Sequence, residues 1–520
     1  MSAPRKIPVI IGVGDFTNHS TRIEDAKEPM QLMLDAIHGA VRDTGLSPDR
    51  QLALQRIIDS VDVVTTWSWP YNDLPGLVGD RLEAHLTHER LSEHGGNSPG
   101  LMLHQSAARI ANGTSEMAIV TGGEALGSLI TLHRAGIQDP EGWTRRPQGG
   151  ISLLEKMMTG SALPESVGTK HGVNQAIHVY PMYENALRAH RKQTYQENLV
   201  ESAQLYASFS ETATKNPAAW TYGKPPTSTE TLQQAIGKNR MICTPYPLLM
   251  NAFNNVNMAS ACLLTNTEMA TKWGIPQDRW VYPRGVLDSK KVMTVMTILQ
   301  RPSYYACPSV SKAIDTALHL ANLSKDDLDV LDIYSQLACE HLGISITNPP
   351  KQITLLGGLT SFGGAGNNYS GNALVAMVRE LRQKENNKTN GLVLANGGLL
   401  THEHAIVLST KAPRRFGFPM EQAHHDASHV GVVPPFIEQA EGEAIVETYT
   451  VEFNRKGLPS RGFIVGQLVN SRQRFVANHG DETTLAELAS TTVEPIGRKG
   501  RVSVGSDGRN LFSFDAHSRL

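Results

Sequence analysis

The sequence predicts an α/β fold with a mostly parallel sheet, an inserted region and a separate β-rich domain at the C-terminus. Three observations support this prediction. Short apolar runs alternate with amphipathic stretches in the first third of the chain, the same alternation returns after about residue 259, and strand-like segments dominate from about residue 444. A chain of 520 residues is too long for one ordinary hydrophobic core, so we expect two or three domains.

The first third contains strand and helix candidates in alternation. Val9–Val13 is an apolar strand candidate, and Met30–Thr44 carries apolar residues along one helical stripe. The segments Ile57–Val64, Leu101–Asn112 and Met117–Gly123 follow as strand, helix and strand. This order of elements favours a parallel sheet whose strands are connected by crossover helices.

The composition changes in the middle of the chain. Residues 126–237 are rich in Gly, Pro, His and Trp and contain only helical patches, so we predict an inserted loop domain there. Beyond it the sheet pattern resumes, with strands expected at 259–264, 330–334 and 391–397 and helices at 309–320 and 371–383. The pattern of the first third therefore occurs twice, once on each side of the insertion.

The last part of the chain predicts a small β-rich domain after a linker. The linker follows Pro413 and contains three histidines, His424, His425 and His429, which we interpret as solvated loop residues. Ala444–Phe453 is a strand candidate with apolar or aromatic residues spaced by two, and further short strands follow it. The domain is similar to an OB-type barrel and has about the minimum length that sustains its own core.

Composition and charge exclude several classes of protein. The net charge of -2 gives no global attraction to nucleic acid or to an anionic membrane, and no apolar run is long enough for a transmembrane helix. The four cysteines show no CxxC pair, which is typical of reduced, buried thiols in a cytoplasmic protein. The final Ser518-Arg519-Leu520 resembles a peroxisomal address, which would matter only in a eukaryote.

Four segments carry a resemblance to a known family. HGGNSPGLMLHQSAARIANGTSEMAIVTGGEA resembles the nucleophile helix of the thiolase superfamily, and GGLTSFGGAGNNYSGNALVAMVREL looks like its "GGxxxxGHPxGxSG" block. GLVLANGGLLTHEH is similar to the "CxGGG" segment, and LDIYSQLACE stands where the "NEAF" or "HDCF" loop belongs. The four segments occur in the family's order and the resemblance spans residues 5–412. The added β-rich domain makes the chain most similar to the subgroup called thiolase-like protein type 1.

This resemblance implies a particular architecture. We expect a thiolase fold of two repeated βαβαβαββ halves in a five-layered αβαβα arrangement, with an inserted loop domain and a small all-β, OB-like domain. The resemblance implies an N-terminal half at 1–125 plus 238–275, a loop domain at 126–237, and a C-terminal half at 276–412. Residues 413–520 then form the linker and the additional β-rich domain.

The residues that perform thiolase chemistry are replaced in this sequence. The nucleophilic cysteine corresponds to Asn97, or to Gly96 if the turn is one residue shorter, and the second cysteine to Ala395. The histidine of GHP corresponds to Gly364, and the Asn or His that orients the oxyanion-hole water to Tyr334. A thioester with the enzyme requires a thiolate, so we expect cysteine-dependent thiolase activity to be absent or altered. The resemblance then implies binding of CoA or an acyl-CoA as a ligand, with no cofactor.

One alternative is an acyltransferase or C–C lyase with different reacting groups. Ser98 stands at a predicted helix start, and a serine nucleophile requires a base such as His94, His402 or His404. The simpler interpretation, which we favour, is that Ser98 caps the helix and that the histidines are exposed or paired with structural neighbours. Two histidines spaced by two could also chelate a metal, but no carboxylate or thiolate completes a recognisable set, so no metal site is predicted.

A second alternative is a non-enzymatic interaction platform. In this alternative, residues 430–520 would bind a protein partner. A nucleic-acid partner is less expected, because glutamates in this region offset the charge of its basic residues. In the leading hypothesis, an acyl-CoA would instead contact the inserted loop domain, where Arg188, Arg191, Lys192, Trp220 and Tyr222 have suitable side chains. The oligomeric state is left as monomer or homodimer.

Overall fold

The structure is a computed structural model that describes residues 5–158, 166–173, 175–288, 299–383, 387–413, 418 and 433–515. The linker histidines 424, 425 and 429 and the C-terminal tripeptide 518–520 lie outside the described residues. Among the described residues, no helix is both long and apolar enough to cross a membrane.

The first sheet has five strands in the order β1-β7-β4-β2-β3. Its strands are β1 (Pro8–Thr17), β7 (Asn257–Asn266), β4 (Met117–Ala125), β2 (Ser60–Val63) and β3 (His88–Leu91). The pairs β4–β2 and β2–β3 are parallel, whereas β7 runs antiparallel to both β1 and β4. β4 and β7 are buried along their whole length, because helices cover both faces of the sheet.

The second sheet repeats the pattern of the first. Its order is β8-β11-β10-β9, formed by β8 (Tyr282–Asp288), β11 (His402–Ser409), β10 (Asn390–Gly397) and β9 (Val330–Asp332). β10 pairs in parallel with β9 and antiparallel with β11, as β4 does with β2 and β7. The sequence repeat therefore corresponds to two similar sheets, and in the described residues only the first sheet has a fifth strand.

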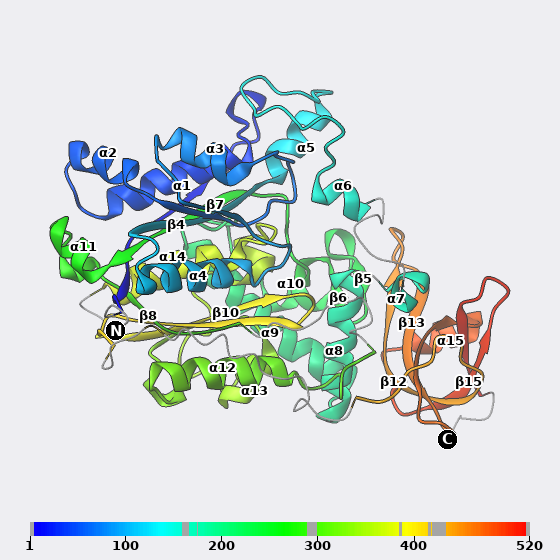
Figure 1. The fold of residues 1–520 in the computed structure, drawn as a ribbon. Coiled ribbons are helices and arrows are strands. Elements are labelled where there is room, and N and C mark those ends of the chain that lie inside the picture. Colours follow the sequence, from blue (N-terminus) through cyan, green and yellow to red (C-terminus); the bar gives the residue numbers. More distant parts are fainter. Residues whose placement is uncertain are drawn as a thin grey trace.

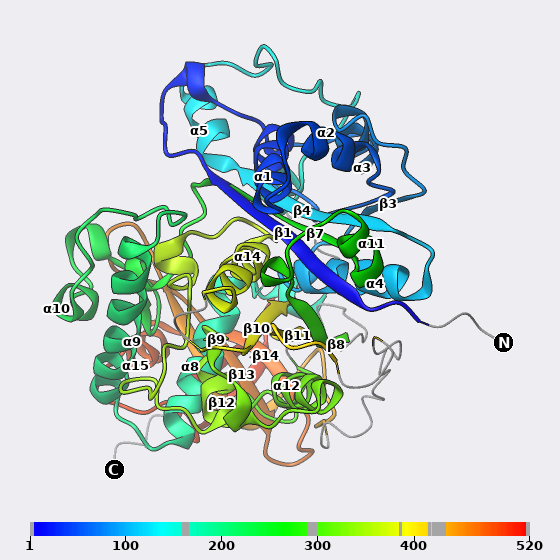
Figure 2. The same ribbon diagram turned by 90° about the vertical axis from the view of Figure 1, so that its left-hand side faces the viewer.

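Helices complete five layers, which Figure 1 shows from top to bottom. α4 (Ser98–Asn112) and α14 (Tyr369–Leu381) contact strands of both sheets and form the central layer, and Figure 2 shows α14 between the sheets. One outer layer has α1 (Pro29–Asp43), α2 (Pro48–Arg56) and α3 (Leu74–Arg81), the other has α12 (Pro308–Ala321) and α13 (Gln336–Leu342), and α11 (Thr267–Lys272) follows β7. The expected five-layered α/β thiolase fold is confirmed.

The insertion is helical, and it begins at the first sheet, where α5 contacts β7, before it continues to α8 and α9 beside the barrel and the second half. It contains α5 (Leu126–Arg134), α6 (Leu153–Met158), α7 (Val167–Lys170), α8 (Ala176–His190), α9 (Tyr195–Lys215) and α10 (Thr229–Gln233). α9 begins at a capping box, in which Thr194 and Glu197 satisfy each other's backbone N–H groups. A short hairpin of β5 (Met241–Cys243) and β6 (Tyr246–Pro247) follows.

The C-terminal region forms a closed five-stranded barrel. Its strands are β12 (Gly442–Phe453), β13 (Pro459–Leu468), β14 (Arg474–His479), β15 (Lys499–Val504) and β16 (Asn510–Phe514), with α15 (Glu482–Leu488) after β14. The order β13-β14-β16-β15-β12 closes because β12 also pairs with β13. Val446, Ile464, Phe475 and Phe512 pack in its core. The predicted β-rich domain is confirmed.

The barrel is joined closely to the insertion. β5 pairs with β12 through Cys243 and Glu452, so the hairpin that we had assigned to the N-terminal half extends the barrel sheet instead. On α8, which packs against β12, the Asn185 amide donates to the Tyr449 carbonyl at 3.0 Å. The buried Arg188 forms an ion pair with Glu494 of the barrel. Figure 1 shows the barrel directly beside α8.

Candidate functional site

The N-terminus of α4 meets the end of β10 in the middle of the molecule. Asn97 is the N-cap residue of α4 and is 9% exposed. A Cβ added to Gly397 would lie 2.0 Å from the Asn97 Oδ1 atom, and one added to Gly96 would lie 2.4 Å from the Asn396 carbonyl oxygen. Glycine is therefore required at position 96, where a backbone oxygen lies in the way, whereas a side chain at position 397 would displace the Asn97 side chain.

Asn97 makes a side-chain contact with the second sheet. Its Nδ2 atom lies 3.3 Å from Nδ1 of His404 on β11, and His404 is paired across the sheet with Ala395 on β10. Burial, together with the charges of His104 and His402, lowers the pKa of His404 to about 3. The ring is therefore neutral at physiological pH and accepts the amide hydrogen at Nδ1. The predicted positions Asn97, Ala395 and His404 thus lie together.

The loop before α14 completes this centre through a residue that the sequence analysis missed. The Asn367 side chain accepts a hydrogen bond from the Gly95 N–H at 3.1 Å and donates to the Thr65 carbonyl at 2.9 Å. The Ser370 hydroxyl donates to the Gly96 carbonyl at 2.9 Å. Asn367 therefore joins the turn before α4 to a loop of the first half. Asn367 lies within the block that resembles the family's glycine-rich motif, but the sequence assigns a role only to the neighbouring positions of that block.

Gly364 lies elsewhere in the same loop. Its N–H donates to the Phe253 carbonyl at 2.7 Å, and a Cβ added to it would lie 2.2 Å from Asn254 Oδ1. Its described neighbours thus belong to the segment before β7 and not to the α4 turn. Gly364, which corresponds to the GHP histidine, therefore packs against residues 253 and 254. Among the described contacts it has none with Asn97.

Tyr334 lies just beyond β9 and is partly buried against the hydrophobic core. Its ring meets the Tyr369 ring edge-on at 4.9 Å between centroids, and, against the larger effect of burial, the Asn396 side chain acts to lower the pKa of its hydroxyl. Burial is the main cause that raises the pKa of Tyr334 far above its usual range. The phenol is therefore protonated at all physiological pH values and can only donate or accept a hydrogen bond.

The Ser98 hydroxyl contacts the backbone, whereas His404, one of the histidines proposed as its base, contacts the neighbouring Asn97. The Ser98 hydroxyl donates to the Glu93 carbonyl at 3.0 Å, which is a local backbone contact. His402 lies beside Gly398, in the turn between β10 and β11. His94 packs its ring against Trp67 at 5.6 Å. No Ser–His hydrogen bond is recorded for these side chains in the described part of the chain, so the serine-nucleophile alternative gains no support.

The opposite face of the second sheet carries a buried polar cluster. Glu403 is fully buried beside Ala405, on the face that packs against the core of α12. Burial, with a smaller effect of the Cys307 thiol, raises the pKa of Glu403 well above its usual range against the opposing charge of Arg301. The Arg301 guanidinium lies over the Tyr183 ring at 4.5 Å. Alternation along β11 thus directs His404 to one face and Glu403 to the other.

A second buried carboxyl lies near the end of β4, the strand of the first sheet that is equivalent to β10. Glu124, the penultimate residue of β4, accepts hydrogen bonds from the Trp67 N–H, the Ser68 N–H and the Ser68 hydroxyl. Burial raises its pKa to about 7, although these three donors act in the opposite direction. A Cβ added to Gly366 would lie 2.5 Å from Glu124 Oε1, so this carboxyl packs directly against the loop of Asn367.

The cysteines lie outside this centre. All four thiols are buried and unbonded to one another, on β5, on β7, before α12 and on α13. Burial raises the pKa of Cys243, Cys262 and Cys339 to about 12. Thiols with such a pKa are poor nucleophiles. Within the described residues, no group of three His, Cys, Asp or Glu side chains is placed to hold a metal ion.

An aromatic and basic surface borders the loop of Gly364, and we call it the glycine-loop rim. The rim consists of His19, Trp220, Tyr222, Lys224 and Phe253. The His19 and Trp220 rings stack at 5.2 Å, and the Trp220 N–H donates to the Phe362 carbonyl just before the glycines. Tyr222 is 50% exposed and Phe253 is 41% exposed. Partial burial and the nearby Lys224 charge lower the pKa of His19.

The other candidate contacts in the insertion serve the fold. Arg188 is paired with Glu494 in the barrel and is 3% exposed. Arg191 lies 3.4 Å from Glu201 of α9. Trp220 and Tyr222 are therefore the two residues of that predicted group that the structure places on the glycine-loop rim.

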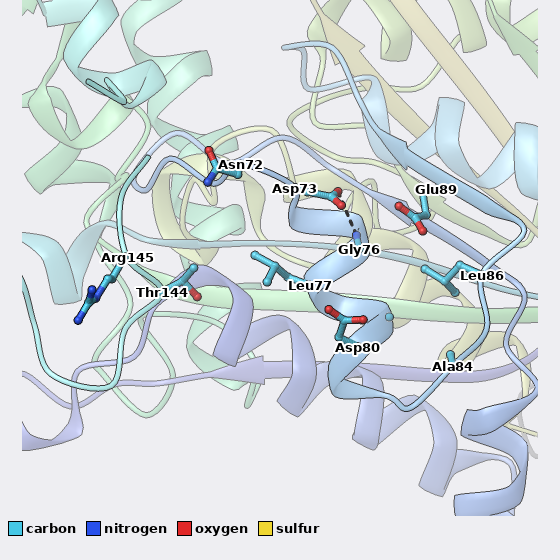
Figure 3. A pocket seen from close by; sticks show the side chains of 11 residues that line it. Asn72, Asp73, Gly76, Leu77, Asp80, Ala84, Leu86, Glu89, Thr144 and Arg145 are labelled. Carbon is cyan, nitrogen blue, oxygen red and sulfur yellow. Dashed lines mark hydrogen bonds between the residues drawn. The ribbon is translucent and has the colours of Figure 1, made fainter. Parts of the chain in front are cut away.

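A separate cavity of about 370 Å³ lies beside α3 (Figure 3). Asp73, Asp80, Glu89 and Arg145 are among its lining residues. Asp73 accepts the Gly76 N–H at 3.1 Å and so acts as the cap of α3. The cavity shares no lining residue with the centre around Asn97.

Comparisons with known proteins agree with this architecture. Residues 427–509 match the family model "Thiolase-like protein type 1 additional C-terminal domain". A monomeric SCP2-thiolase like protein type 1 from Mycobacterium smegmatis is similar in structure, with a TM-score of 0.80 and 28% identity over 98% of this chain and 99% of that one. A comparison with curated protein sequences gives no significant match.

More distant structures share the fold. An Ltp2-ChsH2(DUF35) aldolase matches with a TM-score of 0.57 and 17% identity over 79% of this chain and 98% of that one. Human mitochondrial 3-ketoacyl-CoA thiolase in complex with CoA matches with a TM-score of 0.54 and 16% identity over 78% and 98%. The fold, the motif order and the barrel agree, and the chain belongs to the thiolase superfamily as a thiolase-like protein type 1 with the additional C-terminal domain.

Proposed function

We propose that this protein binds CoA or an acyl-CoA between the α4 N-terminus and the glycine-loop rim, and that it does not perform cysteine-dependent thiolysis. One observation carries the proposal. Asn97, the residue at the start of α4, is packed against Gly397 and lies 3.3 Å from His404 Nδ1, at the place where the family resemblance puts a cysteine.

The chemistry of the remaining groups supports the absence of thiolysis. An amide cannot form a thioester, and Ala395 provides no second thiol. His404 has a pKa of about 3 and is too weak a base to activate a nucleophile near neutral pH. The low pKa of His404 weighs against an acyltransferase or C–C lyase based on Ser98, His402 and His404. The hydrogen bond of Ser98 to a backbone carbonyl also weighs against it.

Two features support binding of an acyl thioester. The positive end of the dipole of the 15-residue helix α4 lies at the centre and favours a carbonyl oxygen there, although in the first turn the Ser98 N–H is bonded to Gly95 and Pro99 has no N–H. The rim supplies exposed aromatic faces and a lysine, which suit the base and the phosphates of a nucleotide-bearing ligand. The protein would hold the ligand without attacking it.

Calorimetric titration with CoA and acetyl-CoA tests this proposal. We expect a dissociation constant in the micromolar range, and a rise in melting temperature at millimolar ligand. Tyr222→Ala and Lys224→Ala should each weaken binding about three- to tenfold, because each removes a contact of about 1 kcal/mol. Lys272→Ala is the matched control, since α11 lies at the other end of β7. A wild-type protein that binds neither ligand would refute the proposal.

An assay of acetoacetyl-CoA thiolysis tests the second part of the proposal, that the protein does not perform cysteine-dependent thiolysis. We expect no turnover above the uncatalysed reaction, because no described thiol reaches the centre. Turnover at ordinary enzymatic rates, with loss of activity in Asn97→Ala, would show that another group has taken over the reaction.

We also propose that the protein is a monomer. The edge strand β3 has the sequence His-Glu-Arg-Leu and three of its four residues are exposed, and charges on an exposed edge strand disfavour pairing with a second copy. The related structure from Mycobacterium smegmatis is also described as monomeric. Light scattering after gel filtration should give a mass near 56.7 kDa, and a mass twice as large would contradict the proposal.

A further inference from the structure

A buried arginine of the barrel reaches into the C-terminal half of the fold. Arg474, at the start of β14, is 2% exposed and forms an ion pair with Glu447 at 2.7 Å. Its guanidinium also donates to the Leu299 carbonyl at 2.8 Å and to the Arg301 carbonyl, and it lies over the Tyr304 ring at 4.8 Å. The barrel therefore fixes the segment 299–304, which belongs to the thiolase part of the chain.

That segment carries a second buried arginine with the same kind of contact. The Arg301 side chain donates to the Leu399 carbonyl at 2.8 Å and to the Leu400 carbonyl. The Tyr183 hydroxyl, from α8, donates to the same Leu399 carbonyl at 3.2 Å. Donors from the insertion and from segment 299–304 thus converge on one short turn between β10 and β11.

The turn that they hold has an unusual backbone. Gly398, Leu399 and Leu400 have φ angles of 56°, 60° and 63°, so three consecutive residues are left-handed and two of them are leucines. Leucine rarely adopts this conformation, which persists only where surrounding contacts impose it. The turn follows Gly397 directly, and Gly397 packs against Asn97 at the start of α4.

We infer that the C-terminal barrel keeps the ligand site in shape from within the same chain. Arg474 fixes segment 299–304, Arg301 fixes the left-handed turn, and the turn places Gly397 against Asn97. Arg474 and Arg301 are positioning residues in this scheme, since neither touches the proposed ligand. The inference rests on the proposed function, because it assigns the acyl end of the ligand to the Asn97–Gly397 contact.

Arginine is required at both positions because one guanidinium bridges two carbonyls. It presents five N–H donors in a fixed plane, whereas a lysine ammonium is a single point of charge on a flexible stem. Arg→Lys therefore keeps the charge and removes the bridge. The contacts also mean that this part of the barrel binds its own chain, so it is not free to bind a partner protein.

Hydrogen exchange of the ligand-free protein tests the coupling. We expect the backbone amides of 397–404 to exchange at least tenfold faster in Arg474→Lys and in Arg301→Lys than in the wild type. Arg498→Lys is the matched control, because the described partners of Arg498, Glu487 and the Phe514 ring, are both within the barrel. Unchanged exchange of 397–404 in Arg474→Lys would overturn the inference.

Ligand affinity provides a readout that general destabilisation would not produce. We expect Arg474→Lys to weaken acetyl-CoA binding three- to tenfold while CoA binding changes less than twofold, because the turn borders only the acyl end. Equal losses for both ligands would overturn the inference. If Arg301→Lys does not fold, Tyr183→Phe removes one donor to the Leu399 carbonyl and should show the same pattern more weakly. A wild type that binds no ligand would refute the proposed function but leave the exchange result valid.

Discussion

The two halves of the fold end their equivalent central strands in different ways. Glu124 is the penultimate residue of β4, and its carboxyl is held by donors from residues 67 and 68 of the same half. β10 ends at Gly397 and continues into the left-handed turn, which is held by Arg301 and by Tyr183 of the insertion. Each strand end packs against the loop that precedes the central helix of the other half, Glu124 on Gly366 and Gly397 on Asn97.

This difference shows how a symmetric scaffold acquires an asymmetric site. The first half supports its strand end with local contacts and a carboxyl that titrates near neutral pH. The second half depends on the insertion and, through Arg474, on the added barrel. Asn97 and Ala395 lie on the central-layer side of the second sheet, and the contacts that hold the turn after β10 come from its opposite face.

The largest expected effect on stability comes from the left-handed turn Gly398–Leu400 in the second half of the fold. Arg301→Met should lower the free energy of unfolding by about 3–5 kcal/mol, because it removes two buried hydrogen bonds from a charged donor and leaves the two carbonyls only the weaker donors Tyr183, Cys307 and Ser309. Urea denaturation measures this change. Arg191→Met is the control, since Arg191 forms a partly exposed pair with Glu201, and it should cost less than about 1 kcal/mol. Equal losses in the two variants would remove the contrast between the halves.

The next largest expected effect is a pH dependence of stability that arises from Glu124 in the first half of the fold. The pKa of Glu124 is raised to about 7 in the folded protein from 4.5, so its contribution to stability is present at low pH and is lost as pH rises through 7. The total is about 3 kcal/mol, since each pKa unit corresponds to about 1.4 kcal/mol. Glu124→Gln should remove this dependence from melting curves recorded between pH 5 and pH 8.

An exposed carboxyl provides the control for that experiment. The hydrogen bonds from Thr194 lower the pKa of Glu197, so its titration falls below this pH range in both the folded and the unfolded state. Glu197→Gln should therefore shift the melting curves equally at every pH tested. A Glu124→Gln variant that keeps the wild-type pH profile would mean that Glu124 does not titrate near 7.

Much of the fold could be predicted from the sequence, because apolar periodicity and motif order are local signals. The helix expected at Leu101–Asn112 begins three residues earlier, since Pro99 is favoured in the first turn of a helix. The hairpin 241–247 could not be assigned to the barrel, because its partner strand starts about two hundred residues later and two-residue strands carry almost no pattern. Local patterns predict elements but not distant pairing.

The candidate site was predictable only where a family motif marked it. Asn97, Ala395 and Tyr334 were found through the motifs, and the structure places each beside the centre. Asn367 and Arg301 were missed, since single polar residues gain their role from contacts distant in sequence. Arg474 is one of the basic residues of the region 430–520, but its burial against segment 299–304 gives it a structural role that the sequence pattern does not indicate.

The smallest expected effect lies at the start of α4, where the two halves meet. Asn97→Ala removes one amide contact with His404 and should lower the free energy of unfolding by about 1 kcal/mol. It should also shift the NMR signals of the His404 ring, which loses its described partner at Nδ1. Ser98→Ala removes a bond to the Glu93 carbonyl instead, so it should cost a similar amount without moving those signals. If both variants move them equally, the signals report helix fraying, and the Asn97–His404 contact is not the feature that joins α4 to the second sheet.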